Sequence, residues 1–152
     1  MTPSTHELLQ YSELQVAAEA FDPSSISGLM QGNGHSSRFT DIEAVAFLQK
    51  YSVVAVSPAS FGKSGFSGTL FQNKQTGALV LSFRSTEFLD DAVRDNQSTN
   101  TFEVKQRGWA FGQIADMENW YQNLIAEGKL AADASLTVTG YSLGGALGCV
   151  LF

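Results

Sequence analysis

The sequence is poor in cysteine and in basic residues, and each shortage excludes a class of function. Its 152 residues contain one cysteine, Cys149, so neither an intrachain disulfide nor a thiolate metal cluster can form. We predict that Cys149 is a small core residue. Nine lysines and arginines stand against fifteen aspartates and glutamates, for a formal net charge of −6. Because no basic run could neutralise phosphates, we expect no nonspecific binding to nucleic acid and no electrostatic docking on anionic lipid.

Long apolar runs are also absent. No stretch reaches the ~18–20 apolar residues that a membrane-spanning helix needs, so no transmembrane segment is predicted. The amino terminus, MTPSTHELLQYSELQVAAEAF, lacks the basic start and the ~7–15-residue apolar core of a secretory signal. The sequence therefore does not decide between a cytoplasmic protein and one exported without an amino-terminal signal. It also does not indicate an oligomeric state. The length suits about one domain.

Helix-like and strand-like segments alternate along the chain, which predicts an α/β fold. The helices are expected over 6–21, from 40 onward, between 109 and 128, and after 143. The strands are expected over 53–56, 66–72, 78–84 and from about 136 to 139, whereas residues 23–37, rich in serine and glycine, are predicted to form a loop. The continuous apolar run Ala78-Leu79-Val80-Leu81 is typical of a strand that is covered on both faces, so we expect a central strand there.

The helix from Thr40 onward has a recognisable start. Thr40 and Glu43 have the spacing of a capping box, in which each side chain bonds the backbone N–H of the other residue. The apolar residues Ile42 and Val45 then recur at helical steps.

The most informative motif is Gly140-Tyr141-Ser142-Leu143-Gly144, which fits the pattern G-x-S-x-G. In a nucleophile elbow of this spacing, a strand turns sharply into a helix and exposes a serine hydroxyl. The two flanking glycines are needed because a Cβ at either position would collide with neighbouring backbone. A strand-like run before the motif and an uninterrupted apolar run after it match this geometry. We therefore predict that Ser142 is a catalytic nucleophile and that Gly140 and Gly144 are the elbow glycines.

A catalytic serine needs an adjacent base and two donors for the oxyanion of the tetrahedral intermediate. In an elbow, one donor is the backbone N–H of the next residue, here Leu143. The second donor must come from a loop after another strand, and the segment Phe83-Arg84-Ser85-Thr86 is well placed for this role. Such chemistry requires no metal and no organic cofactor.

Three other features have weaker functional interpretations. Gly62-Lys63-Ser64 imitates the end of a phosphate loop, but a strand is predicted to follow where phosphate binding needs a helix amino terminus. Asp90, Asp91 and Asp95 could ligate a hard cation, although the first turn of a solvated helix explains them better. His35 lies in a glycine-rich loop where nothing has metal-ligand spacing. No metal site is predicted from these residues.

Two motifs together resemble a known family. The segment FRSTE at 83–87, an amphipathic helix and then VTGYSLGGALG resemble the class-three (fungal-type) lipases of the α/β-hydrolase group, which have relatives among bacterial lipases and phospholipases A1. The resemblance covers residues 66–152. It implies an α/β-hydrolase fold, an acyl-ester lipid substrate, Ser142 as the nucleophile and Thr86 in the oxyanion hole. The sequence departs from the family pattern at Ser85, where glycine is usual, and in Val104-Lys105-Gln106-Arg107-Gly108-Trp109, where the family has V-H-x-G-F.

The partners of a serine triad are missing from the sequence after the motif. In this fold the acid and the base histidine follow the nucleophile, but none of the ten residues after Ser142 is Asp, Glu or His. The only histidines, His6 and His35, precede Ser142. We therefore expect residues 1–152 to form a single partial hydrolase domain, an amino-terminal portion with hairpin strands, helices and the elbow. The alternative is a noncatalytic lipase-like remnant that binds or assembles through its apolar surface.

Overall fold

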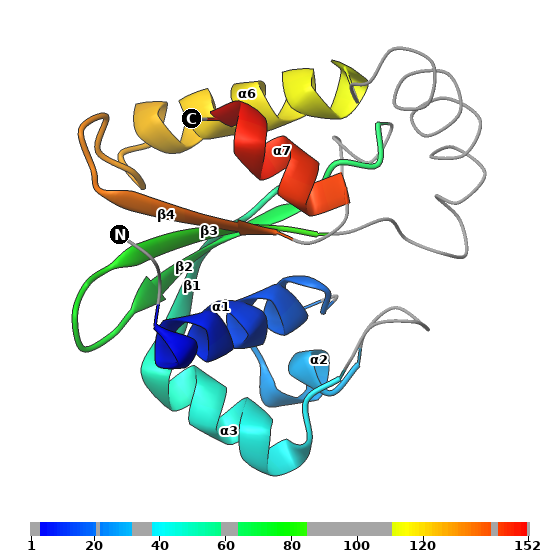
Figure 1. Cartoon of the computed structure of the whole chain (residues 1–152), viewed down its shortest axis with the longest axis vertical. Helices are drawn as coiled ribbons and strands as arrows, with labels where there is room; N and C mark the ends of the chain where they lie inside the picture. The colour runs from blue at the N-terminus through cyan, green and yellow to red at the C-terminus, as the bar shows by residue number, and fades with distance from the viewer. Residues whose placement is uncertain are drawn as a thin grey trace.

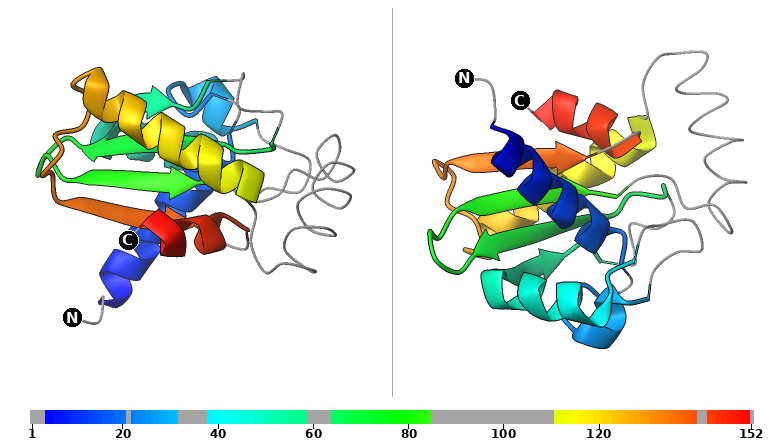
Figure 2. Two further views of the ribbon diagram at one scale, coloured as in Figure 1. Left: turned by 90° about the horizontal axis from the view of Figure 1, so that it is seen from above. Right: turned by 60° about the horizontal axis from the view of Figure 1, so that its bottom comes forward.

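The computed structural model describes residues 4–20, 22–31, 38–58, 64–84, 111–140 and 143–151. Its helices and strands form a mixed α/β architecture of three layers, with a sheet between two layers of helices. Figure 1 shows α6 and α7 on one face of the sheet and α1, α2 and α3 on the other, and the two views of Figure 2 agree. We call α1, α2 and α3 the lower layer, and α6 and α7 the upper layer.

The sheet has four strands in the order β1-β2-β3-β4. They are β1 (Tyr51–Val56), β2 (Gly68–Asn73), β3 (Leu79–Phe83) and β4 (Leu136–Gly140). The pairs β1–β2 and β2–β3 are antiparallel, and β3–β4 is parallel. Strand β3 therefore has a neighbour on each side, which confirms the prediction of a central strand.

The tight turn between β2 and β3 follows from its sequence. The side-chain oxygen of Asn73 accepts hydrogen bonds from the backbone N–H groups of Gln75 (2.9 Å) and Thr76 (3.1 Å). Gly77 then takes φ of 73°, in the left-handed region that glycine adopts without strain. Together these residues set the register in which Leu79 lies opposite Gln72.

The lower layer contains α1 (Thr5–Ala18), α2 (Ile26–Leu29) and α3 (Asp41–Lys50). Helix α3 begins at the predicted capping box, because the Thr40 side chain accepts from Glu43 N–H and the Glu43 carboxylate accepts from Thr40 N–H. The prediction of an uninterrupted loop over 23–37 is wrong, since α2 lies within it. Its first turn is capped by Ser25, whose side chain accepts from Gly28 N–H, and four residues are too few to give a detectable period.

The apolar stripe predicted for α3 points away from the core. Ile42 is 81% exposed and Val45 is 37% exposed, whereas Ala44 and Phe47 are buried. The rotation of the helix follows the ring of Phe47, which packs edge-on against Phe71 of β2 at a centroid distance of 5.7 Å. Burying one aromatic ring outweighs burying two smaller aliphatic side chains at the rim of the layer.

The upper layer contains α6 (Phe111–Ala126) and α7 (Leu143–Leu151). The buried residues of α6 recur every three or four positions, as in an amphipathic helix: Gln113, Met117, Trp120 and Leu124. The helix is followed by Gly128 with φ of 69°. The N–H groups of Lys129 and Leu130 then bond the carbonyl of Leu124 at 2.9 Å and 3.1 Å, which satisfies a carbonyl of the last turn.

Each face of the sheet has its own core cluster. The lower cluster is centred on Phe39, Phe47, Tyr51 and Phe71, and α1 adds Leu14 and Ala17. The upper cluster includes Leu70, Leu81, Phe83, Trp120 and Leu147. The alternation along β3 separates them, because Val80 faces the lower layer while Leu81 and Phe83 face the upper one.

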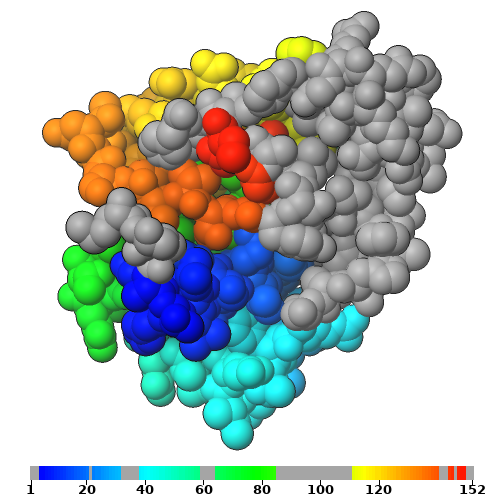
Figure 3. Space-filling view, in the orientation of Figure 1, coloured from blue at the N-terminus to red at the C-terminus, as the bar shows by residue number. Residues whose placement is uncertain are grey.

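Cys149 is exposed, so the prediction that it lies in the core is wrong. Helix α7 packs on the sheet through Leu147, which is buried, and Gly148, whose position is close to the Val138 side chain of β4. Position 149 then lies 100° further round the helix, toward solvent. Figure 3 shows α7 at the surface beside the β4 segment.

Candidate active site

The turn from β4 into α7 is built from backbone in close contact. The strand ends at Gly140 and the helix begins at Leu143. A Cβ on Gly140 would lie 2.9 Å from the nitrogen of Gly145 and closer still to the carbonyl oxygen of Gly144. Real Cβ atoms essentially never approach so closely, so glycine is required at position 140 for this turn.

Gly144 meets the same restriction against a different strand. A Cβ at this position would lie 3.0 Å from the carbonyl oxygen of Arg84 and closer still to that of Phe83. The first turn of α7 therefore lies directly on the carboxyl end of β3. The crowding at both positions confirms the steric requirement for glycine that the G-x-S-x-G spacing predicts.

The carboxyl ends of β3 and β4 lie side by side. The two strands are parallel, and Phe83 is the register partner of Gly140. Chain segments that follow parallel neighbouring strands leave the sheet at the same edge, where α/β proteins commonly bind ligands. Arg84, which follows β3, and Gly140, which ends β4, are the last described residues at this edge.

The residues predicted for catalysis are described to different extents. Ser142 and Thr86 lie outside the described residues, as do Ser85, His35, Asp90, Asp91 and Asp95. Leu143 is described as the first residue of α7. A backbone N–H in the first turn of a helix has no acceptor within that helix, so the N–H of Leu143 is not used by the α7 ladder.

His6 is far from this edge along α1. It is exposed in the first turn of α1, where its Nε2 lies 2.7 Å from the side-chain nitrogen of Gln10. Gln15, further along the same helix, donates a hydrogen bond from Nε2 to the carbonyl oxygen of Phe83 at 3.0 Å. With a rise of ~1.5 Å per residue, His6 lies ~13 Å along the helix axis from the residue that contacts the carboxyl end of β3.

Sequence reasoning missed Gln15. Its side chain also accepts from the Ser82 hydroxyl at 3.3 Å and donates to the Glu19 carboxylate at 3.3 Å, so it joins α1 to the last two residues of β3. No motif marks this glutamine, which stands between two apolar residues of an amphipathic helix. Only the packing of α1 beneath β3 brings it to the strand end.

Ser64 has a structural role in place of the phosphate-binding one considered from the sequence. Its hydroxyl donates to the carboxylate of Asp116 on α6, and its carbonyl accepts from Gln113 Nε2 at 3.0 Å. The chain then enters β2, as predicted, so no helix amino terminus begins after Ser64. These bonds fix the approach to β2 against the buried face of α6.

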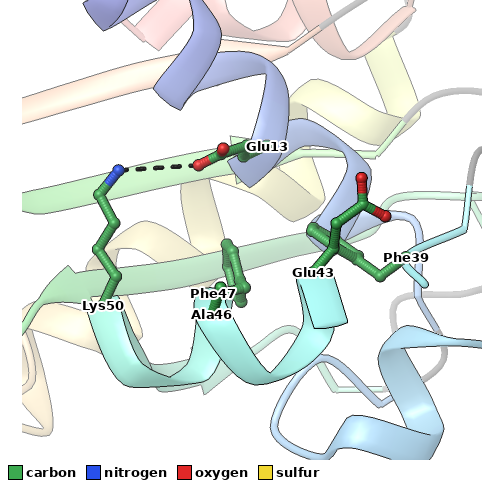
Figure 4. Close-up of a pocket in the computed structure, with 6 residues that line it drawn as sticks. All are labelled: Glu13, Phe39, Glu43, Ala46, Phe47 and Lys50. Carbon is green, nitrogen blue, oxygen red and sulfur yellow. Dashed lines mark ion pairs between the residues drawn. The ribbon is translucent and has the colours of Figure 1, made fainter. Parts of the chain in front are cut away.

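The lower layer contains a small hollow between α1 and α3, with a volume of about 180 Å³. Figure 4 shows its lining residues, with Lys50 paired to Glu13 across the opening at 3.7 Å between Nζ and Oε2. The rings of Phe39 and Phe47 line it as well. The hollow lies on the face of the sheet opposite α7, and no residue predicted for catalysis lines it.

Among the described residues, the carboxyl groups with lowered pKa lie at helix starts. Backbone and side-chain hydrogen bonds from Ser4 lower the pKa of Glu7, and those from Thr40 lower the pKa of Glu43. The hydroxyl groups of Ser24 and Ser25 lower the pKa of Asp22. These groups stabilise helix ends and take no part in the edge formed by β3 and β4.

Within the described ranges, no group of three or more His, Cys, Asp or Glu side chains could hold a metal ion. No helix in the same ranges combines the length and the apolar character needed to cross a membrane. No family model matches the chain, and neither a curated protein nor a solved structure matches it.

Proposed function

We propose that the chain carries the nucleophile and the oxyanion-hole segment of a carboxylic-ester hydrolase of lipase or phospholipase A1 type, with an α/β-hydrolase fold. The single observation that carries this proposal is the contact of Gly144 with the carboxyl end of β3. It supports an arrangement in which the turn bearing Ser142 and the segment bearing Thr86 start from neighbouring strand ends.

The proposed chemistry is acyl transfer through a covalent intermediate. The Ser142 hydroxyl attacks the carbonyl carbon of an ester, while a base removes its proton. The N–H of Leu143 and the hydroxyl and backbone of Thr86 stabilise the negative oxygen of the tetrahedral intermediate. The alcohol leaves with the proton from the base, and water then hydrolyses the acyl-enzyme by the same two steps in reverse.

The base and its acidic partner are not among the residues that follow Ser142. Removal of the base histidine from a serine triad lowers kcat by a factor on the order of 10⁶, even when the oxyanion hole is intact. We therefore expect the 152-residue chain by itself to be nearly inert, and we expect activity from a product whose reading frame supplies a downstream Asp and His.

Reaction with a fluorophosphonate probe tests the proposal. We expect the product with the downstream residues to be labelled at Ser142, and the 152-residue chain to react at least ~10³ times more slowly because it lacks the base. Ser142→Ala should abolish labelling and the hydrolysis of acyl esters while leaving thermal unfolding nearly unchanged. Ser4→Ala, a serine in the amino-terminal cap of α1, is the matched control and should keep full labelling.

The reading frame beyond codon 152 discriminates between the two hypotheses from the sequence. A frame with a downstream Asp and His, together with labelling at Ser142, supports the hydrolase. Failure of Ser142 to react in that product would exclude it. A stop codon directly after Phe152 would instead favour the noncatalytic remnant.

A further inference from the structure

The peptide group between Phe83 and Arg84 is held by three elements. Its carbonyl oxygen accepts from Gln15 Nε2 of α1 at 3.0 Å. Its N–H belongs to Arg84 and donates to the carbonyl of Ser67 at 3.0 Å, just before β2. Gly144 of α7 packs against the same peptide so closely that a Cβ would not fit. The orientation of this peptide is therefore fixed from the lower layer, from the sheet and from the upper layer.

The orientation of the Gln15 amide follows from its neighbours. Its NH₂ group faces two acceptors, the Phe83 carbonyl and the Glu19 carboxylate, while its oxygen faces the Ser82 hydroxyl. A flipped amide would place its oxygen against both acceptors and lose two hydrogen bonds. Ser82 is completely buried and Glu19 is 7% exposed, so water competes little for these groups.

We propose that Gln15 is a positioning residue for the site at the β3–β4 edge. It fixes the plane of the Phe83–Arg84 peptide, on which α7 begins and after which the segment leading to Thr86 leaves the sheet. This role rests on the proposed function, whereas the hydrogen bond from Gln15 to the peptide belongs to the described residues alone. Through this contact, α1 on the lower face sets the geometry of a turn on the upper face.

A displacement of this peptide would directly change the position of the first turn of α7. Because Gly144 has no space to yield toward Phe83, a rotation of the carbonyl must shift the first turn of α7 as well. Oxyanion donors must lie within ~0.3 Å of their best distance, so small shifts of this kind lower reactivity without unfolding the protein. If Gln15 had only a structural role, its substitution would lower the free energy of unfolding. It would leave the geometry of the β3–β4 edge unchanged in the molecules that remain folded.

Hydrogen exchange of the full chain tests whether Gln15 holds the Phe83–Arg84 peptide in place, and it does not require activity. The variant Gln15→Met keeps the side-chain length and removes the donor. We expect at least ~tenfold faster exchange at the amides of Arg84 and Leu147, and less than ~twofold change at Phe71 in β2, because only the strand end opens. The matched control is Gln10→Met on the same helix, where the glutamine is half-buried and its Nε2 lies 2.7 Å from His6 Nε2, and it should change none of these amides.

The variant Gln15→Glu adds a readout that lost packing would not give. Its carboxylate cannot donate to the Phe83 carbonyl at neutral pH, whereas the protonated acid can. We expect the excess exchange at Arg84, corrected for the intrinsic pH dependence, to disappear as the pH falls through the pKa of the new carboxyl group, which the neighbouring Glu19 carboxylate raises above its ordinary value of about 4.3. Equal acceleration at all three amides, or none, in both Gln15 variants would overturn the proposal.

Fluorophosphonate labelling separates this proposal from the proposed function. In a product that is labelled at Ser142, Gln15→Met should slow labelling by about tenfold or more, while Gln10→Met should not. If Gln15→Met accelerates exchange selectively at Arg84 and Leu147 but the unsubstituted product is not labelled, the hydrolase is disproved. The contact of Gln15 with the Phe83–Arg84 peptide is then still supported. Equal labelling rates in the unsubstituted and Gln15→Met proteins would overturn the positioning role and leave the hydrolase standing.

Discussion

The two faces of the sheet differ in how closely the backbone of their helices approaches the strands. On the lower face, large side chains fill the space: the rings of Phe39, Tyr51 and Phe71 surround Phe47 at centroid distances of 5.0–5.7 Å. On the upper face, large side chains such as Phe83 and Trp120 also form a core, but close approach to the strands depends on positions without a side chain. Gly140 and Gly144 let backbone approach backbone, and Gly68 leaves room for the ring of Trp120. The lower face is therefore expected to be most sensitive to the removal of a large side chain, and the β3–β4 edge of the upper face to the addition of a single methyl group.

The first prediction removes a side chain from the lower face. Phe47→Ala should lower the free energy of unfolding by about 3–5 kcal/mol, since a buried ring is lost and its cavity is closed only in part. Urea unfolding followed by circular dichroism measures the change. The control Ile42→Ala, on the same helix at a position 81% exposed, should change it by no more than about 0.5 kcal/mol. A loss below about 1 kcal/mol for Phe47→Ala would mean that the ring cluster does not hold this layer.

The second prediction adds a side chain to the upper face. Gly144→Ala should lower the free energy of unfolding by about 1–3 kcal/mol, because the new Cβ meets the backbone of β3, which cannot move without disrupting the sheet. In a product that reacts with fluorophosphonate, the same change should also abolish labelling of Ser142.

The matched control for this addition is Gly148→Ala, one turn further along α7. Its Cβ would lie 3.1 Å from a methyl group of Val138, a side chain that can adjust, and alanine favours the helix. We expect the free energy of unfolding to stay within about 1 kcal/mol of the original. Equal destabilisation by both substitutions would contradict the idea that backbone contact sets the sensitivity of Gly144.

The third and smallest prediction concerns the helix starts of the lower face. Thr40→Ala should cost about 1 kcal/mol at pH 7, because α3 loses its amino-terminal cap. The pKa of Glu43 is lowered in the folded protein by its bonds from Thr40. The stabilisation linked to that carboxyl group is therefore complete above its ordinary pKa of about 4.3 and is lost as the pH falls through the lowered folded value.

Thermal unfolding between pH 7 and pH 3 measures this linkage. Glu43→Gln should flatten the decline at acid pH, since glutamine keeps an acceptor and cannot be protonated in this range. Curves for the original and the Glu43→Gln proteins that run parallel over the whole range would exclude a contribution from this carboxyl group.

Local signals in the sequence predicted much of the fold. The capping box at Thr40 and Glu43 and the apolar run of β3 each depend on neighbours within a few residues, and each is confirmed. The crowding around Gly140 was expected from the spacing of its motif. These features could be found because their physical causes lie within short segments.

Features that depend on distant contacts were missed or placed wrongly. The outward rotation of Ile42 follows from the packing of Phe47 on β2, and the exposure of Cys149 follows from how α7 lies on β4. The link between Gln15 and Phe83 joins residues 68 positions apart. No periodicity encodes such a contact, because it exists only after α1 has packed beneath the sheet.

The parallel pairing of β3 with β4 has a consequence for the order in which the molecule assembles. Leu79 and its partner Gln72 are separated by seven positions, whereas Leu79 and Leu136 are separated by 57. The longer closure spans about three doublings of length and costs about 2 kcal/mol more in chain entropy. We therefore expect the antiparallel hairpins to form early and the pairing of β4 with β3 to be completed last, so that amides of β4 gain protection after those of β2 in pulse-labelled refolding. Newly made chains would pass through a stage in which most of the sheet exists and the contact between α7 and the end of β3 does not.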